Sequence, residues 1–170
     1  CHGDHLGDTL DIARRTGATV VGVAELRGML TEAGLKSCLG NIGGWGPMPF
    51  GRVKLLQAIH GSGLPGALAC GFLIGIGGKK IYFAGDTAFY GDMALLAEEK
   101  LDAALLPIGD FYTMGPDDAA RAARAVGAKI TVPMHYDTFP AIRQDPQAFK
   151  ALCEPAVKVA VLRPGESLEL

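Results

Sequence analysis

The residues best suited to chemistry stand at the start of the chain, where His2, Asp4 and His5 fall within four positions. Gly3 lies between them and permits an unusual backbone turn, so one short loop can direct two imidazoles and a carboxylate toward a common point. Borderline divalent cations favour this mixture of nitrogen and oxygen ligands. The alternative is a polar terminus in which two histidines happen to lie together, because short motifs also occur by chance.

The other histidines favour a metal site. The chain contains four histidines in all, and His60 and His135 each follow an apolar stretch that is typical of a strand. Asp86 follows another such stretch, within Gly-Asp-Thr. Strand ends can meet at one edge of a sheet, and ligands bind at this edge in α/β proteins. A structural role is ordinary for any single histidine, but all four at such positions indicate a shared site.

The elements that would position these residues alternate between strand and helix, which indicates an α/β fold. Periodicity and stop signals predict helices over residues 6–16, 25–33, 91–100, 115–126 and 144–152. Strands are predicted over residues 18–23, 52–59, 66–77, 81–84, 101–107 and 129–133, with a closing pair at 157–162 and 167–170. Glycines and prolines mark residues 40–51 as a loop, in which Trp45 is either part of a lid or a local core contact.

Composition limits the classes of partner. With 170 residues and 17.7 kDa, the chain fits one domain spanning residues 1–170. Its net charge of -2 gives no attraction to nucleic acid or to an anionic membrane, so we expect neither partner and a small-molecule substrate instead. The most apolar stretch, residues 64–78, is interrupted by Pro65 and several glycines and cannot form a transmembrane helix.

The cysteines and the first residue bear on location. The four cysteines are scattered without Cys-x-x-Cys pairs, which is typical of reduced thiols, so we expect a cytoplasmic protein. We interpret Cys38, Cys70 and Cys153 as packing residues. The chain begins with Cys1 instead of Met, as a mature lipoprotein does, but a start inside a longer coding sequence fits better because no flexible linker follows.

Taken in order, His2-Gly3-Asp4-His5, His60, Gly85-Asp86-Thr87 and His135 resemble the metallo-β-lactamase superfamily. The hallmark of that family is His-x-His-x-Asp-His, followed by a His, a bridging Asp and a last His. Residues 107–116 and 133–140 are similar to its uncharacterised metal-dependent hydrolase branch, related to the ascorbate-phosphate lactonases. The resemblance covers essentially the whole chain and implies an αβ/βα four-layer sandwich, here lacking its N-terminal strands. It also implies that a first His of the motif would precede Cys1.

The resemblance implies a dinuclear metal site and a role for each ligand. His2 and His60 would bind one ion, Asp4, His5 and His135 the second, and Asp86 would bridge both. We expect zinc, with manganese as the alternative. Two such ions lower the pKa of a shared water and hold it as a metal-bound hydroxide aimed at a carbonyl or phosphorus, with Asp4 orienting it and Asp86 holding the pair. With one imidazole missing, we expect weaker binding of the first ion, and association with a second copy of the chain as a homo-oligomer is left open.

We therefore expect a metal-dependent hydrolase of a small ester, lactone or phosphoester. The alternative is a nuclease acting on phosphodiesters, against which the flat charge counts. A redox-sensing module is a third class, but the sequence lacks a flavin-binding region and the extra carboxylates of a diiron site. Ser62 has no strand-to-helix elbow and no spare histidine base, so we interpret it as a loop hydroxyl that helps to bind substrate. Tyr112, Thr113 and Tyr136 line the pocket or, as we favour, pack their loops; Asp137 stands where this branch has Asn.

Overall fold

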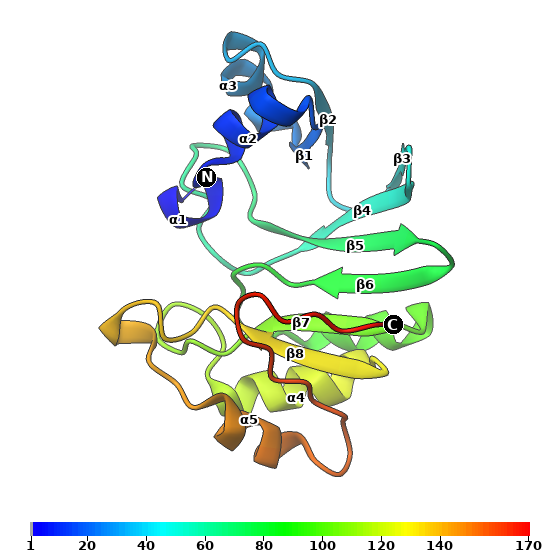
Figure 1. Ribbon diagram of the computed structural model, residues 1–170, viewed down its shortest axis with the longest axis vertical. Coiled ribbons are helices and arrows are strands. Elements are labelled where there is room, and N and C mark those ends of the chain that lie inside the picture. Colours follow the sequence, from blue (N-terminus) through cyan, green and yellow to red (C-terminus); the bar gives the residue numbers. More distant parts are fainter. Residues whose placement is uncertain (1) are drawn as a thin grey trace.

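The computed structural model describes residues 2–170 and contains two β-sheets with helices on their outer sides (Figure 1). Cys1, which the resemblance assigns to a variable position of the metal motif, lies outside the described residues. The larger sheet has the strand order β3-β4-β5-β6-β7-β8. Its strands are β3 (Trp45–Met48), β4 (Gly51–Gln57), β5 (Cys70–Ile76), β6 (Lys79–Phe83), β7 (Ala103–Pro107) and β8 (Ile130–Met134).

The strand directions matter most for the site. Pairing is antiparallel from β3 to β6 and parallel from β6 to β8. Strands β4, β6, β7 and β8 therefore all run the same way, and their carboxyl ends lie at one edge of the sheet. The loops that leave these ends can meet there.

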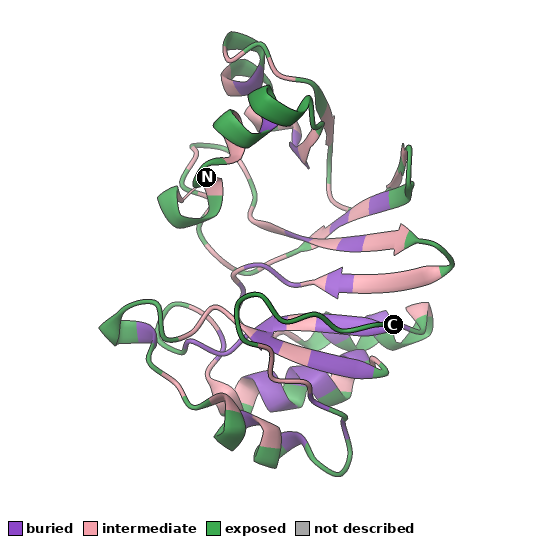
Figure 2. Ribbon diagram, in the orientation of Figure 1, coloured by how far each residue is buried: buried purple, intermediate pink, exposed green. Residues whose placement is uncertain are grey.

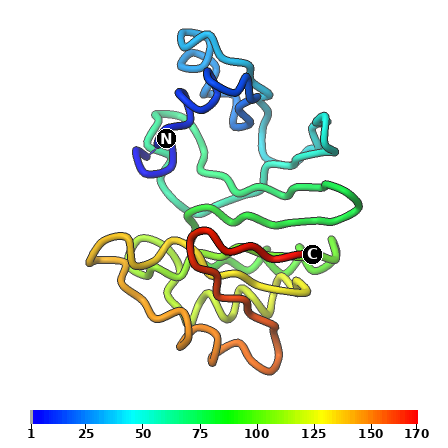
Figure 3. The backbone as a smooth tube through the Cα atoms, viewed as in Figure 1, coloured from blue at the N-terminus to red at the C-terminus, as the bar shows by residue number. Residues whose placement is uncertain are grey.

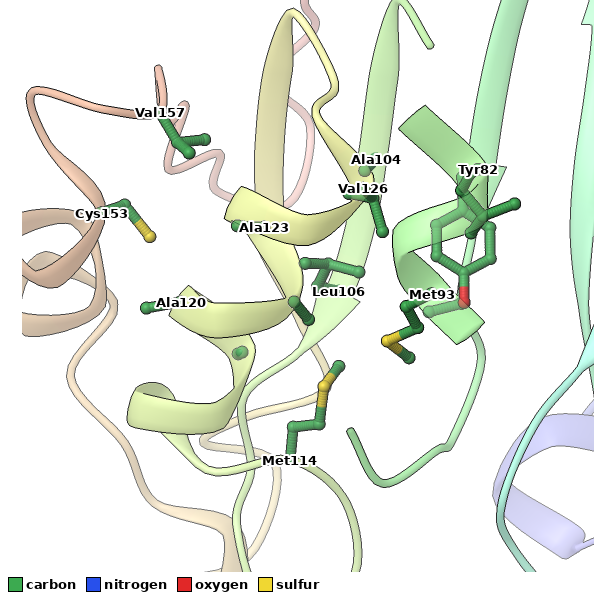
Figure 4. Close-up of a cluster of buried hydrophobic side chains, with 14 of the residues drawn as sticks. Tyr82, Met93, Ala104, Leu106, Met114, Ala120, Ala123, Val126, Cys153 and Val157 are labelled. Atoms are coloured by element: carbon green, nitrogen blue, oxygen red, sulfur yellow. The ribbon is translucent and has the colours of Figure 1, made fainter. Parts of the chain in front are cut away.

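The parallel half of the sheet carries the hydrophobic core. Strands β7 and β8 are apolar and largely buried, as expected for parallel strands. Helix α4 (Pro116–Val126) packs on them with a face of small residues, Ala119, Ala120, Ala122 and Ala123, all at most 2% exposed. Small side chains on the helix let it approach the sheet closely. Larger side chains, such as Leu106 and Met114, fill the remaining space between the helix and the sheet (Figure 4). Figure 2 shows the buried residues concentrated in this half.

Two further helices complete this layer. The 3-10 helix η2 (Gly91–Glu99) and helix α5 (Pro146–Cys153) both contact α4. Helix α4 begins with a proline in its first turn and ends at Gly127 with φ 60°, the left-handed conformation that terminates a helix. The predicted helices over 115–126 and 144–152 are thus observed with small shifts of their ends, and the short η3 (Pro140–Ile142) lies between β8 and α5.

Residues 2–40 form the opposite side of the molecule. Strands β1 (Val20–Val23) and β2 (Ser37–Gly40) pair in parallel, accompanied by α1 (Gly3–Leu6), α2 (Thr9–Thr16), η1 (Ala24–Leu26) and α3 (Arg27–Glu32). The sequence predicted one helix over residues 6–16, but Gly7 adopts φ 42° and ψ -132°, which no helix contains. His5 therefore lies in a separate single turn. The resulting order of helices, small sheet, large sheet and helices is the expected αβ/βα arrangement (Figure 1).

Two parts of the secondary structure differ from expectation. The closing strand pair at 157–162 and 167–170 is wrong, because this tail joins the sheet through a parallel bridge from Val159 to Thr131 and then turns at Arg163–Glu166. Figure 3 shows the tail passing beside the parallel half of the sheet. Residues 40–51, predicted as a loop, contain β3, which tolerates Pro47 because it is an edge strand. Trp45 lies in β3 and packs against the core. The Arg52 guanidinium lies over its indole ring, with Cζ 4.1 Å from the ring centre.

Membrane and redox features can be stated briefly. Among residues 2–170, no helix is both long and apolar enough to cross a membrane. Cys38, Cys70 and Cys153 are free thiols, and Cys153 is buried in the core while the other two are partly exposed. Burial raises the pKa of the Cys70 and Cys153 thiols, which keeps them protonated and inert at neutral pH.

Candidate metal centre

Four segments bring their functional side chains to the edge where β4, β6 and β8 end. His60 lies in the loop after β4, Asp86 in the loop after β6, and His135 directly after β8. The single turn α1 supplies Asp4 and His5, with His2 as the residue just before it. Histidines and carboxylates that are far apart in the sequence thus meet in space, as their strand-terminal positions predicted.

The turn at the N-terminus is fixed by its own backbone. The His2 carbonyl accepts hydrogen bonds from the N–H groups of His5 (3.1 Å) and Leu6 (2.9 Å), and Gly7 closes the turn onto Gly3 (2.8 Å). This puts Asp4 and His5 on the side of the turn that meets the large sheet. A single turn has little helical stability of its own, so contacts with the sheet must help to hold it.

One group of ligand atoms comprises Asp4, His5, Asp86 and His135. The Nε2 atom of His5 lies 2.9 Å from Asp86 Oδ2, and the Nε2 atom of His135 lies 3.4 Å from Asp86 Oδ1 and 3.5 Å from Asp4 Oδ2. The rings of His5 and His135 stack with centres 5.3 Å apart. All four ligand atoms lie within 4.8 Å of one another, so one ion can reach them together.

A second group comprises His2, His60 and Asp86. The Nε2 atom of His60 lies 3.5 Å from Asp86 Oδ2, and the rings of His2 and His60 meet edge to face with centres 5.2 Å apart. Their ligand atoms also lie within 4.8 Å of one another. Asp86 belongs to both groups and is the more buried of their two carboxylates, its side chain 10% exposed against 57% for Asp4.

The chemistry of these atoms fits divalent cations. Two ligands bound about 2.1 Å from one tetrahedral ion lie about 3.4 Å apart, which is the range of the separations here. Asp86 Oδ1 and His135 Nδ1 are buried without a hydrogen-bond partner among residues 2–170, although buried polar atoms are normally satisfied. The Asp86 carboxylate thus has imidazoles of both groups beside it, with His5 and His60 near Oδ2 and His135 near Oδ1.

Backbone strain is concentrated next to His135. His135 and Asp137 have φ values of 53° and 62°, and Asp110 and Phe111 in the neighbouring loop have 63° and 43°. Non-glycine residues adopt this conformation only when their surroundings impose it, and such residues cluster at functional sites. These values place the two loops after β7 and β8 in a closely determined backbone conformation next to the candidate ligand His135.

The Asp4 carboxyl is tuned by its neighbours. Burial is the largest single influence and raises its pKa, but a hydrogen bond from its own backbone N–H and the nearby His5 and His135 together lower the pKa below its usual range. Asp4 is therefore ionised at neutral pH and can accept a hydrogen bond or bind a cation.

The structure brings all six predicted ligands together, and the secondary candidates behave differently. Asp137 lies in neither group of ligand atoms, and its N–H bonds to the Ile142 carbonyl. The Ser62 hydroxyl donates to the Leu64 carbonyl at 2.8 Å and so closes its own loop. Tyr136 is partly buried against the core, and Thr113 donates to the Met114 carbonyl at 3.4 Å, so both pack their loops as favoured.

A rim of exposed aromatic rings lies on the two loops that follow β7 and β8. Phe111, Tyr112 and Phe139 are 80%, 51% and 41% exposed. The rings of Phe111 and Tyr112 meet edge to face at 4.8 Å, and Phe139 lies 6.2 Å from Tyr112. Of these three, only Tyr112 was a candidate from the sequence, where packing of its loop was favoured over lining the pocket. Two adjacent aromatic residues in a loop after a buried strand were a usable signal.

A cavity of about 350 Å³ adjoins the His2 and His60 side of the centre, between β1 and β5. Its remaining wall is largely apolar, with Val21, Leu26 and Phe72 among the lining side chains. Its polar part is formed by His2, His5, Thr9, His60, Ser62 and Asp86. No lysine or arginine is among the described residues that line it. This side of the centre is therefore largely apolar and has no cationic side chain among the described residues that line it.

Comparison with known proteins gives consistent matches. Residues 1–136 match the family model described as the Beta-lactamase superfamily domain. A UPF0173 metal-dependent hydrolase of Geobacillus thermodenitrificans is 49% identical over 99% of this chain and 78% of its own length. A relative with the same description from Heliobacterium modesticaldum is 46% identical over 99% of this chain and 77% of its own length.

Solved structures agree. Igni18, described as a novel metallo hydrolase of Ignicoccus hospitalis, has a TM-score of 0.93 at 39% identity, covering 99% of this chain and 75% of that chain. The metallo-β-lactamase fold protein YhfI of Bacillus subtilis has a TM-score of 0.75 at 16% identity, covering 97% of this chain and 73% of that one. The second likeness concerns the fold alone.

Proposed function

This chain belongs to the metallo-β-lactamase superfamily and is a metal-dependent hydrolase, and we propose that it uses two divalent ions to hydrolyse a small ester, lactone or phosphoester. The observation that carries the proposal is the position of Asp86, whose carboxylate is shared by two separate groups of ligand atoms. One ion would be held by His2, His60 and Asp86, and the other by Asp4, His5, His135 and Asp86. We assign zinc because imidazole and carboxylate ligands suit it, with manganese as the alternative.

The bound ions would supply Lewis acidity, which activates a water molecule and polarises the oxygen of the scissile bond. The side chains of this chain supply the rest. Asp86 keeps the two groups in register through its two oxygens. Asp4 is ionised and largely exposed, so it can accept a hydrogen bond from the attacking water and aim it at the substrate. His5 and His135 stack on each other, and this contact helps to hold both imidazoles in place.

The surroundings support an apolar substrate group. Exposing three aromatic rings in one rim costs hydrophobic free energy that binding an apolar group would recover. The cavity beside His2 and His60 is also apolar. We therefore favour esters or lactones with an apolar substituent, which we place against Phe111, Tyr112 and Phe139.

A nuclease with the same metals is less favoured. Binding a phosphodiester chain depends on lysine and arginine contacts with the phosphates. The described residues lining the cavity include neither, and the whole chain has a net charge of -2. A small phosphoester remains within the proposal, because its charge can be met by the ions alone.

The test is a comparison of metal-free and metal-loaded protein. Protein stripped with a chelator is reloaded with zinc or manganese and assayed with phenyl acetate, ethyl acetate, a δ-lactone, p-nitrophenyl phosphate and bis(p-nitrophenyl) phosphate. We expect turnover that requires metal, is lost in Asp86→Ala and is retained in the exposed control Asp92→Ala. Metal-independent turnover, or turnover of the phosphodiester alone, would contradict the proposal.

The attacking group is tested separately. Ser62 is the aliphatic hydroxyl nearest in sequence to a candidate ligand histidine, but its loop hydrogen bonds already engage it. Ser62→Ala should keep turnover within about threefold, because no covalent intermediate is required. Detection of an acylated Ser62 by mass spectrometry would require a serine mechanism instead.

We also place the protein in the cytoplasm. The three free thiols of the described residues support a reducing compartment. The expected partner is the substrate itself. Association with a second copy of the chain is decided by measuring the oligomeric state in solution.

A further inference from the structure

Thr87 follows Asp86 directly and is completely buried, with 0% of its surface exposed. Its Oγ1 accepts a hydrogen bond from the Ile59 N–H at 3.0 Å and donates one to the Ala88 carbonyl at 2.8 Å. The Ala88 N–H in turn donates to the Ile59 carbonyl at 3.1 Å. Thr87, the residue after Asp86, is therefore connected directly to Ile59, the residue before His60.

This connection joins two strand ends that the hydrogen bonds of the sheet do not join. Strands β4 and β6 carry His60 and Asp86 at their ends, but β5 lies between them in the strand order. Two strand spacings of about 4.8 Å separate their axes by about 10 Å, so no ladder hydrogen bond joins β4 to β6. The Thr87 hydroxyl and the Ala88–Ile59 bond cross over the start of β5 and tie the two loops together.

A third loop is anchored at the same residue. The Thr87 carbonyl accepts a hydrogen bond from the Met114 N–H at 3.1 Å, and the Met114 carbonyl accepts one from the Asp110 N–H at 3.0 Å. The loop held in this way abuts His135, because a Cβ added to Gly109 would lie 2.5 Å from the His135 carbonyl oxygen. Thr87 thus lies in the loop after β6 and hydrogen-bonds to the loops after β4 and β7, and none of these bonds involves the side chain of a candidate ligand.

We propose that Thr87 is a positioning residue that sets the separation of His60 and Asp86 and so controls how tightly the His2–His60–Asp86 group binds its ion. The inference rests on the proposed metal site, but its test reads metal binding without turnover. Removing a residue that orients metal ligands typically lowers metal affinity about 10- to 100-fold. The loss should fall on this group, because the ligands of the other group come mainly from α1 and β8.

Two substitutions separate positioning from packing. Thr87→Val keeps the shape but removes the acceptor of the Ile59 N–H, whereas Thr87→Ser keeps the hydroxyl but removes the methyl group. If the hydroxyl positions the ligands, the valine variant loses affinity for one ion about 10- to 100-fold and the serine variant stays within a few-fold of wild type. A packing role predicts the reverse.

The chain offers a matched control. Thr131 is also 0% exposed, and its Oγ1 has no hydrogen-bond partner among residues 2–170. Thr131→Val should therefore leave both metal affinities unchanged.

The measurement is a zinc titration of each metal-free variant with a competing chelator, together with the visible spectrum of the cobalt-substituted protein. If the Thr87 hydroxyl positions the ligands, only Thr87→Val should show a lower affinity for one ion and an altered cobalt spectrum. Equal affinities in Thr87→Val and wild type would overturn the proposal. If the valine variant does not fold, Thr87→Ser decides, since a tenfold or larger loss there contradicts positioning by the hydroxyl. Absence of zinc binding in the wild type would instead overturn the proposed function together with this inference.

Discussion

Asp86 is the residue on which both groups of candidate ligands depend. Its Oδ2 faces His60 at 3.5 Å and its Oδ1 faces His135 at 3.4 Å. We predict that Asp86→Ala removes both ions, whereas His135→Ala removes one and leaves the His2–His60–Asp86 ion in place. Elemental analysis after dialysis against equal concentrations of zinc, with Asp92→Ala as a surface control, measures the difference.

Two results would contradict this prediction. Undiminished metal content in Asp86→Ala would mean that the two groups are independent, or that the ions bind elsewhere. Loss of both ions in His135→Ala would mean that the second group supports the first.

At this scale the sequence was informative for ligands and less so for their supports. All six candidate ligands were identifiable because histidine and aspartate at glycine-flanked strand ends are themselves a chemical signal. Thr87 carries no such signal, because a threonine after a strand is ordinary and its role depends on which loops it joins. Phe111 and Phe139 form a rim only once the loops after β7 and β8 lie side by side.

Among the elements, the close contact between the ends of β7 and β8 holds the His135 loop. A Cβ added to Gly109 would lie 2.5 Å from the His135 carbonyl oxygen and 3.0 Å from the Ile142 Cβ, so the backbone would have to move. We predict that Gly109→Ala lowers the free energy of unfolding by about 1 to 3 kcal/mol through overpacking. It should also lower the affinity for the ion held by Asp4, His5 and His135, because the His135 side chain moves with its backbone.

Urea unfolding and zinc titration of the same variant measure the two effects. Gly91→Ala is the matched control, since an added Cβ there meets nothing within 4 Å. If Gly109→Ala binds zinc and unfolds as Gly91→Ala does, the two loops are less tightly coupled than the structure indicates.

Elements with strong local signals were predicted well, and elements that depend on tertiary context were not. The parallel strands β7 and β8 are continuous apolar runs, and α4 has a proline start and a glycine stop. Strand β3 was missed because Pro47 argues against a strand unless the strand lies at an edge. The closing strands were wrong because an apolar tail can lie beside β8 with a single bridge instead of a ladder. The break at Gly7 depends on a conformation that composition does not specify.

In the molecule as a whole, the metal centre joins two parts of unequal packing. The N-terminal part, through β2, has Ala13, Val23 and Leu30 as its buried hydrophobic residues among those described, whereas the core cluster lies in the other part. Ligands from both parts would share the ions. Removing the metal should therefore lower the free energy of unfolding. Relative to protein at a free metal concentration of 100 times Kd, the decrease should be about 2.7 kcal/mol.

The loss should also be local. Hydrogen exchange measured with and without a chelator should show lost protection in α1, α2 and β1, with β7 and α4 little changed, because weakly packed parts open first. Equal loss of protection throughout, or none in the N-terminal part, would contradict a site that joins the two.

The dinuclear centre can be located directly in crystals of the zinc-loaded protein, from anomalous scattering measured on either side of the zinc absorption edge. We predict two peaks on either side of Asp86, each about 2.0 to 2.2 Å from its ligand atoms. One peak should contact His2 and His60, and the other Asp4, His5 and His135. A single peak, or peaks that do not share Asp86, would contradict the dinuclear centre and the hydrolytic mechanism built on it.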